Sequence, residues 1–471
     1  MKSTLKYWLP LICPLLVLLL PAGALPIPHL TLLEQRVIAI FLLAALCWVL
    51  EPIPIYATSV LIIVLELLLL SDGGFKPLTS GYPAGQLGQL MSYKQIMATF
   101  ASPIIMLFLG GFFLAMAASK YRLDMNLARV LLRPFGSKPR NLLLGLMGIT
   151  ALFSMFMSNT ATTAMMLAIL APVLGVFAPQ DPGRVAFTLA IPLAANIGGI
   201  GTPIGTPPNA IALRYLTGEN AIGFAEWMAF GVPFVLVLMA VAWGLLCWLF
   251  PPQQQAIKLD IRGKFLQTPK AWLVYATFVL TVGLWLFGEP LGMNSYVVGL
   301  VPVAIFTVTR VVTKEDLKTL SWDVLWLVSG GIALGLAMES TGLAKHMVDA
   351  IPFADFSPLL LLLLASLLSL LMANFMSHTA TANLLLPLAA ALGSTLPGLA
   401  EVGGVVALLL AVTFASSLGM SLPISTPPNA LAHATGNVAT RQMAKIGVLC
   451  GLLGLLLCYL MLLTMGLTGY L

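Results

Sequence analysis

Residues 203–210 read Pro-Ile-Gly-Thr-Pro-Pro-Asn-Ala and residues 423–430 read Pro-Ile-Ser-Thr-Pro-Pro-Asn-Ala, which are identical at seven of eight positions. Each copy follows a second polar motif, Ser158-Asn159-Thr160-Ala161-Thr162 in the first case and Ser377-His378-Thr379-Ala380-Thr381 in the second. The distance from the central threonine of this motif to the threonine of Thr-Pro-Pro-Asn is 46 residues in the first copy and 47 in the second. Two motifs repeated in the same order at nearly the same spacing indicate an internal duplication.

The composition places this duplication in a lipid bilayer. Hydrophobic residues make up 59% of the 471 residues, charged residues make up 8%, and the mean hydropathy is +1.00, which is far from the values of soluble domains. A helix needs about 20 apolar residues to cross the hydrocarbon core. Such runs predict an all-α polytopic membrane protein with about eleven transmembrane helices, near residues 8–25, 33–50, 53–71, 100–118, 185–213, 226–250, 271–288, 294–310, 322–341, 404–432 and 444–466.

Two further apolar stretches, 141–178 and 356–394, carry the Ser-Asn-Thr and Ser-His-Thr motifs at their centres. Unsatisfied polar groups in hydrocarbon are costly and persist only around a cavity or a ligand, so a polar turn here predicts a re-entrant hairpin. An ordinary crossing with satisfied hydroxyl groups is the alternative. The duplicated polar motifs therefore predict a transporter whose binding site is built from two repeats.

The lysine and arginine residues predict the orientation, because cytoplasmic segments carry an excess of them. With the N-terminus inside, 18 of the 23 Lys and Arg residues fall on the cytoplasmic side, and the outside set is Arg36, Lys76, Lys94, Arg214 and Lys345. Five crossings separate the hairpins, so the first is expected to enter from the cytoplasm and the second from outside. The repeats are then inverted, the C-terminus lies outside, and the net charge of +6 reflects topology rather than a nucleic-acid partner.

The N-terminal segment and the cysteines have simpler interpretations. Residues 1–25 resemble a signal peptide, with Lys2 and Lys6 before an apolar run and Ala22-Gly23-Ala24 near its end, although we expect a retained first helix. The five cysteines lie in apolar segments without metal-ligand spacing and are expected to be packing residues. Glu66 lies in an apolar run and is either a relay group or a buried structural acid.

The proline pairs predict interrupted helices, because proline removes a donor and clashes with the preceding turn. The helix-break motifs are Thr206, Pro207, Pro208 and Asn209 in the first repeat and Thr426, Pro427, Pro428 and Asn429 in the second. A break inside the membrane frees carbonyl groups that can coordinate a cation and N–H groups that can face an anion. Hydroxyl and amide groups without a neighbouring arginine suit a small anion accompanied by small cations.

The pairing of Ser-Asn-Thr hairpin tips with Thr-Pro-Pro-Asn breaks resembles the divalent anion/sodium symporter family of dicarboxylate and citrate transporters. The resemblance extends from about residue 30 to the C-terminus. It implies a homodimer in the cell inner (plasma) membrane, in which a transport domain slides as an elevator against a scaffold. It also implies a C4 dicarboxylate substrate such as succinate, malate or fumarate, sodium as the coupling ion, and no other cofactor.

The same resemblance assigns domains and site residues. The scaffold would comprise residues 1–140 and 271–355, the transport domain residues 141–250 and 356–471, and residues 251–270 a cytoplasmic linker. The substrate carboxylates would contact Asn159, Thr160 and Thr379, with Pro427 of the second break nearby. The first sodium site would use Ser154, Ser158, Asn159 and the region of Gly199, all of which are present.

The second sodium site departs from the family pattern. Besides Ser377 the pattern has a threonine where this chain has Ala373 and an asparagine where it has His378, so the site is expected to be weakened. A protonated His378 could stand where the cation stood, because histidine titrates near physiological pH. Alternatively, a neutral His378 donates a hydrogen bond to a substrate carboxylate.

Other functions stay open on the sequence alone. A sodium-independent dicarboxylate exchanger of the same fold and an anion channel are the alternatives to a sodium-coupled transporter. A membrane enzyme is disfavoured, because the sequence has no His-Glu-x-x-His motif, no phosphate-binding loop and no paired intramembrane carboxylates.

Overall fold

A computed structural model of the protein describes residues 2–21, 25, 27, 30–257, 264–350 and 356–470. The small-residue segment Ala22-Gly23-Ala24 and residues 258–263 of the expected linker lie outside the described residues. The regular secondary structure of the described part is helical, apart from an isolated β-bridge between Ser71 and Met91. The all-α class predicted from composition is confirmed.

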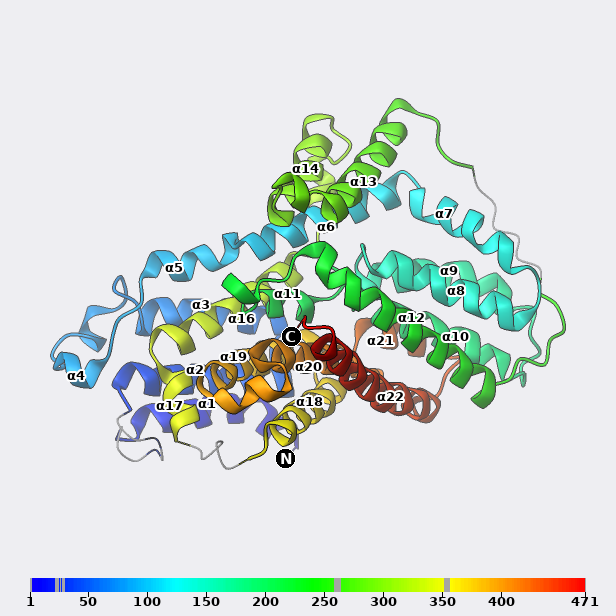
Figure 1. The fold of residues 1–471 in the computed structure, drawn as a ribbon. Coiled ribbons are helices and arrows are strands. Elements are labelled where there is room, and N and C mark those ends of the chain that lie inside the picture. Colours follow the sequence, from blue (N-terminus) through cyan, green and yellow to red (C-terminus); the bar gives the residue numbers. More distant parts are fainter. Residues whose placement is uncertain are drawn as a thin grey trace.

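The helices follow one another in this order: α1 (Lys2–Leu19), α2 (Leu32–Leu50), α3 (Ile55–Leu69), α4 (Ala84–Leu87), α5 (Tyr93–Ala98), α6 (Pro103–Lys120), α7 (Leu123–Leu132), α8 (Pro139–Ser154), α9 (Asn159–Leu174), α10 (Gly183–Gly199), α11 (Pro207–Leu213), α12 (Phe224–Leu249), α13 (Pro269–Phe287), α14 (Ser295–Val308), α15 (Lys314–Leu317), α16 (Trp322–Ser340), α17 (Leu343–Asp349), α18 (Pro358–Phe375), α19 (His378–Thr395), α20 (Gly404–Ser417), α21 (Pro427–Ala434) and α22 (Thr440–Leu467). Figure 1 shows α8, α9, α10 and α12 together on the right, α2, α3 and α16 on the left, and α13 and α14 at the top. Seven helical segments in the described residues are long and apolar enough to cross a membrane, and they are Leu32–Leu50, Tyr93–Lys120, Phe224–Leu249, Pro269–Phe287, Trp322–Ser340, Pro358–Phe375 and Thr440–Leu467.

Both predicted hairpins are pairs of helices joined at the polar motif. Hairpin 1 consists of α8 and α9 with its tip at residues 155–158, and hairpin 2 consists of α18 and α19 with its tip at residues 376 and 377. Ser377 caps α19, since its Oγ accepts a hydrogen bond from the backbone N–H of Ala380 at 3.1 Å. Ser158 precedes α9 without a side-chain cap, which leaves its hydroxyl free for other contacts.

Both proline motifs begin a helix instead of ending one. The first interruption is residues 200–206, between α10 and α11, and the second is residues 418–426, between α20 and α21. Pro207 and Pro427 are therefore the first residues of their half-helices, where a missing N–H costs nothing. The breaks predicted at these motifs are present, and each lies just before its proline pair.

The side chain of one asparagine stabilises each interruption by hydrogen bonds. The Asn209 Nδ2 donates to the carbonyl groups of Gly199, Ile200 and Thr202 at 3.1, 3.2 and 2.8 Å. The Asn429 Nδ2 donates to those of Met420 and Leu422 at 2.8 and 3.0 Å. Backbone groups freed by the break thus receive side-chain donors, as buried polar groups require.

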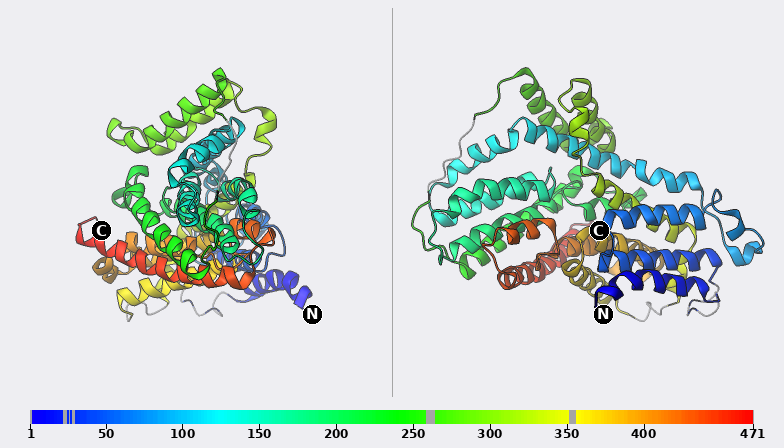
Figure 2. Two further views of the ribbon diagram at one scale, coloured as in Figure 1. Left: turned by 90° about the vertical axis from the view of Figure 1, so that its right-hand side faces the viewer. Right: turned by 180° about the vertical axis from the view of Figure 1, so that it is seen from behind.

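Glycine pairs in α6 and α16 join the repeats to each other. A Cβ atom on Gly110 would lie 2.0 Å from the Gly299 carbonyl oxygen in α14, and one on Gly330 would lie 2.4 Å from Cβ of Ser59 in α3. Helix α6 of the first repeat therefore packs on α14 of the second, and α16 of the second packs on α3 of the first. The two further views in Figure 2 show these segments, distant in sequence, lying side by side.

Candidate functional site

The first repeat gathers the residues expected to hold a sodium ion. Ser154, at the end of α8, places its Oγ 2.5 Å from Asn159 Oδ1 and 2.8 Å from the Ala195 carbonyl oxygen. A Cβ atom on Gly199 would lie 2.8 Å from Asn159 Oδ1, so the carboxamide is in contact with the end of α10. Three of the four residues expected at this site, Ser154, Asn159 and Gly199, therefore meet where hairpin 1 contacts the break, and they present neutral oxygen atoms of the kind that hard cations prefer.

Thr202 belongs to this site, although the sequence analysis did not single it out. Its buried hydroxyl donates a hydrogen bond to the Met155 carbonyl, which joins the first interruption directly to the tip of hairpin 1. Because the second repeat has Leu422 at the corresponding position, comparison of the repeats could have identified Thr202.

The second repeat is built differently at the equivalent place. His378 is 7% exposed, and its Nε2 lies 2.7 Å from the carbonyl oxygen of Gly419, the counterpart of Gly199. Ala373 stands where the first repeat has Ser154, and a Cβ atom on Gly419 would lie only 2.4 Å from its Cβ. The imidazole is therefore hydrogen-bonded to the carbonyl oxygen that a cation at this site would use as a ligand. The methyl group of Ala373 supplies no ligand atom.

Asn374 is a second residue that the sequence analysis missed. Its Oδ1 accepts a hydrogen bond from the backbone N–H of Ser421 at 2.9 Å, and its Nδ2 donates to Leu370 O at 2.8 Å. Asn374 thereby ties hairpin 2 to the second interruption, as Thr202 does in the first repeat. The links made by Thr202 and Asn374 use different residue types at positions that do not correspond between the repeats. Comparison of the repeats therefore does not predict Asn374.

Asn196 of α10 connects the first repeat to the second break. Its buried Nδ2 lies 3.2 Å from both Thr426 Oγ1 and Asn429 Oδ1. The corresponding residue in α20 is Ser416, whose shorter side chain bonds to the carbonyl of Thr413 instead. The Asn209 Oδ1 is consequently buried without a hydrogen-bond partner among the described residues. The two breaks are thus related in sequence but unequal in their hydrogen bonding.

The two hairpin tips also differ in exposure. Thr160 is exposed, whereas Thr379 is only 8% exposed. A cavity of about 200 Å³ lies beside the first tip, between Ser158 and Ala161 on one side and the end of α6 and residues 319–321 on the other. Among the described residues no hydrogen bond joins Thr160 to Thr379, and Pro427 is exposed at the start of α21, so the structure does not bring all the predicted substrate ligands into direct contact.

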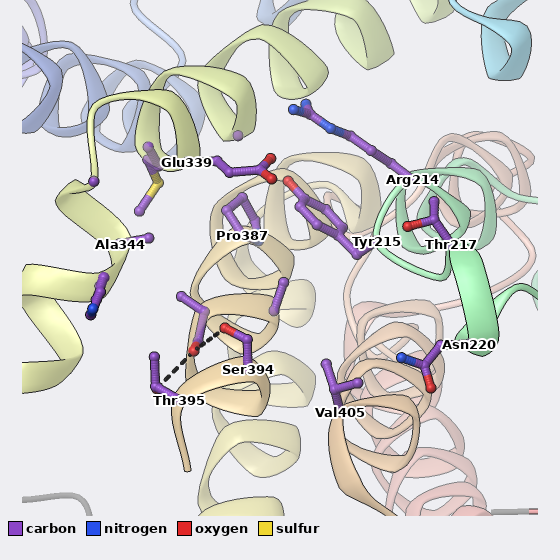
Figure 3. Close-up of a pocket in the computed structure, with 16 residues that line it drawn as sticks. Arg214, Tyr215, Thr217, Asn220, Glu339, Ala344, Pro387, Ser394, Thr395 and Val405 are labelled. Atoms are coloured by element: carbon purple, nitrogen blue, oxygen red, sulfur yellow. Dashed lines mark hydrogen bonds between the residues drawn. The ribbon is translucent and has the colours of Figure 1, made fainter. Parts of the chain in front are cut away.

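A larger cavity of about 370 Å³ lies where the end of α11 meets α16, α17 and α19 (Figure 3). The Tyr215 hydroxyl and the Glu339 carboxylate face each other in it, and Arg214 lies over the Tyr215 ring with its guanidinium carbon 5.4 Å from the ring centre. Glu66, in nearby α3, is fully buried, and its carboxylate oxygens have no hydrogen-bond partner among the described residues.

Comparison with known proteins identifies the family. A family model described as citrate transporter matches residues 45–403. The chain belongs to the citrate transporter family. A sodium-dependent dicarboxylate transporter of Staphylococcus saprophyticus is 31% identical over 89% of this chain and 83% of its own length, and one from Staphylococcus aureus is 32% identical over 87% and 82%. An uncharacterised transporter of Schizosaccharomyces pombe is 32% identical, and the chain spans about half of its length.

A solved structure agrees with this family assignment at the level of the fold. The YdaH transporter of Alcanivorax borkumensis superimposes with a TM-score of 0.56 and 14% identity, covering 88% of this chain and 98% of that one. This member of the citrate transporter family is therefore a multi-pass membrane transporter and not an enzyme. The resemblance to divalent anion/sodium symporters is confirmed.

Proposed function

We propose that this family member is a secondary-active transporter of small dicarboxylates, which moves sodium with its substrate through one complete cation site. The observation that carries the proposal is the difference between the repeats. Ser154 and Asn159 converge on Gly199 in the first repeat, whereas His378 occupies the Gly419 carbonyl in the second. The staphylococcal relatives are named as sodium-dependent dicarboxylate transporters, which supports both the substrate class and the coupling ion.

The substrate class follows from the two tips. Each tip supplies a threonine hydroxyl, and each break presents the start of a half-helix, where N–H groups favour negative charge. Two similar half-sites suit two carboxylates, so the proposed substrates are succinate, malate, fumarate or a related di- or tricarboxylate. The substrate contacts are assigned to Asn159, Thr160, Thr379 and Pro427.

His378 replaces the second cation in this proposal. Its Nε2 is directed at the Gly419 carbonyl at 2.7 Å, toward the break, so this nitrogen is already engaged and the ring lies where a cation would bind. A protonated imidazole at this place supplies the charge that a sodium ion supplies elsewhere. Ser377 and the backbone remain as a weak second site.

The proposed architecture is a homodimer of inverted repeats in the inner membrane, with the N-terminus in the cytoplasm and the C-terminus outside. The transport domain comprises 141–250 and 356–471, and it moves as an elevator against the scaffold, 1–140 and 271–355. The exposed Thr160 and the buried Thr379 support an inward-facing arrangement, since hairpin 1 is expected to open to the cytoplasm. The paired contacts of α6 with α14 and of α16 with α3 support the inversion.

Uptake into proteoliposomes tests this function. External sodium, pH and internal dicarboxylate are varied independently, and the uptake of labelled succinate is measured. A sodium gradient is expected to drive accumulation into empty vesicles. Uptake only into dicarboxylate-loaded vesicles, without a sodium effect, would replace the proposal with the exchanger, and conductance without coupling would indicate a channel.

A further inference from the structure

Hairpin 2 is fastened to α16 by a side chain to which neither the family nor the repeats assign a role. Asn383, in α19, is fully buried, and its Nδ2 donates a hydrogen bond to the Leu327 carbonyl of α16 at 3.1 Å. Its Oδ1 has no partner among the described residues. Water does not reach this buried amide. Its one hydrogen bond between the two helices therefore lies in a medium of low dielectric, where a hydrogen bond is electrostatically stronger than in water.

The fit between these helices depends on Gly331. A Cβ atom at Gly331 would lie 1.8 Å from Asn383 Oδ1 and 2.0 Å from Asn383 Cγ, closer than any real contact. The next turn of α16 repeats the arrangement, because a Cβ atom at Gly335 would lie 2.1 Å from the Tyr215 hydroxyl oxygen. Figure 3 shows Tyr215 reaching toward this helix from the end of α11. α16 therefore accepts polar side chains from α19 and from the segment that follows α11 along one glycine-lined face.

Asn383 is placed to act on the hairpin tip. It lies four residues after Thr379 in the same helix, and residues at this spacing share one face. Anchoring Asn383 to the α16 backbone fixes the first turns of α19 and keeps Thr379 at 8% exposure.

Among the residues that the structure describes, the first repeat has no such anchor. The residue equivalent to Asn383 is Ala164, which is exposed, and the glycine equivalent to Gly331 is Gly111, whose added Cβ would lie 3.3 Å from Ile204 Cδ1. Hairpin 1 is separated from α6 by the cavity at Ser158. Among the described residues, hairpin 2 is therefore anchored to its glycine-containing helix, α16, and hairpin 1 is not anchored to α6 in this way.

We infer that Asn383 is a positioning residue that locks hairpin 2 closed against α16 and so favours the state with Thr379 buried and Thr160 exposed. The inference rests on the proposed function for its place in a transport cycle, in which α19 must leave α16 when Thr379 opens. By repeat symmetry, α9 would then approach α6, where Ala164 provides no hydrogen bond to Leu107, the counterpart of Leu327. The two states are consequently unequal in energy.

Cysteine labelling tests the lock without any substrate. The five native cysteines are first replaced, and Thr160→Cys and Thr379→Cys are then introduced in separate proteins. The rate at which each new cysteine reacts with a polar maleimide in permeabilised proteoliposomes measures the accessibility of its hairpin tip. Asn383→Ala is expected to raise the labelling rate at position 379 about fivefold and to lower the rate at position 160, which corresponds to losing one hydrogen bond. Gly331→Ala is expected to change the rates in the same direction, whereas Gly111→Ala should leave them within about twofold.

Ala164→Asn provides the reciprocal test at an exposed position that does not endanger folding. It is expected to give hairpin 1 a matching anchor, and so to lower labelling at position 160 relative to the control Ala164→Leu. Unchanged labelling ratios in Asn383→Ala protein that elutes as a single sharp species would overturn the lock. If Asn383→Ala does not fold, equal ratios for Ala164→Asn and Ala164→Leu would overturn it. A shifted ratio, together with a failure of the parental protein, in which Thr160 and Thr379 are intact, to transport dicarboxylates, would refute the proposed function alone.

Discussion

At the scale of single residues, Asn159 and His378 hold equivalent positions in the two repeats and make different contacts. The Asn159 carboxamide faces Ser154 and the end of α10, and so leaves oxygen atoms around a common point. The His378 ring fills the corresponding place with a nitrogen bonded to Gly419. Equivalent positions of a repeated motif therefore make different contacts while both hairpins keep the same helix–turn–helix form.

The double change Ala373→Thr with His378→Asn is expected to restore a second sodium site. A threonine hydroxyl and a carboxamide oxygen replace a methyl group and an imidazole, so sodium gains ligands and the titrating group disappears. Uptake measured against sodium concentration and pH should show a steeper sodium dependence and a flatter pH profile. Unchanged curves in a folded, active double variant would show that His378 does not stand in for a cation.

The threonine hydroxyls of the two tips are expected to bind the substrate. Thr160→Ala and Thr379→Ala should each weaken transport of succinate, malate and fumarate by about 1–3 kcal/mol, because each removes a donor from a site of low dielectric. Concentration-dependent uptake measures the loss. Thr464→Ala is the matched control, since Thr464 is exposed in α22 and its hydroxyl bonds to the Met461 carbonyl of its own helix. Parental uptake by both tip variants would place the substrate elsewhere.

The sequence predicts the conspicuous residues of the site but not the ones that connect them. Polar motifs inside hydrocarbon segments are costly, and so the hairpins and the Thr-Pro-Pro-Asn breaks could be located to within a few residues. Thr202, Asn374 and Asn196 act through contacts with residues 47 to 233 positions away, as the Thr202–Met155, Asn374–Ser421 and Asn196–Asn429 bonds illustrate. Such contacts have no periodicity and leave no local signal in a single sequence.

At the scale of helices, α6 and α16 each carry a glycine pair whose two members face different neighbours, and the arrangement is the same in both helices. The first glycine of each pair faces a helix of the other repeat, which is α14 for Gly110 and α3 for Gly330. The second faces the break or the hairpin, through Ile204 for Gly111 and Asn383 for Gly331. Each of these two helices therefore has one face for the proposed scaffold and another for the elements proposed to move.

Gly110→Ala is expected to separate α6 from α14. The added Cβ would lie 2.0 Å from a backbone carbonyl that cannot rotate away, and such overpacking costs about 1–3 kcal/mol or more. Thermal unfolding of the purified protein in detergent measures the loss. Gly148→Ala in α8 is the control, because nothing lies within 4 Å of its added Cβ and alanine favours a helix by about 1 kcal/mol over glycine. Equal stability of the two variants would contradict the contact.

At the scale of the whole molecule, the inverted-repeat proposal predicts opposite accessibility of the two tips. In the cysteine-free protein, Ser158→Cys should react with a polar thiol reagent mainly from the cytoplasmic side and Ser377→Cys mainly from outside. The cavity beside Ser158 and the burial of the second tip provide the physical reason in the present conformation. Labelling is measured on right-side-out and inside-out vesicles. Labelling of both positions from the same side under all conditions would refute the inversion.

The charge carried per cycle provides the last prediction. Moving one charge through 100 mV changes the free energy by about 2.3 kcal/mol, so a dianion entering against an inside-negative potential costs about 4.6 kcal/mol unless cations accompany it. One sodium ion and a proton on His378 make the cycle neutral, whereas one sodium ion alone leaves a net charge of −1. Accumulation of fumarate should therefore be insensitive to potential at low pH.

At high pH, where His378 carries no proton, an inside-negative potential of 100 mV should lower fumarate accumulation by about 50-fold, the equivalent of 2.3 kcal/mol. Potassium diffusion potentials of either sign, set with an ionophore in proteoliposomes, allow the comparison at each pH. The double variant Ala373→Thr with His378→Asn is the control, because two sodium ions would make it insensitive to potential at every pH. Strong opposition by an inside-negative potential at low pH would mean that no proton travels with the dianion, and His378 would then replace the second sodium ion in position but not in charge.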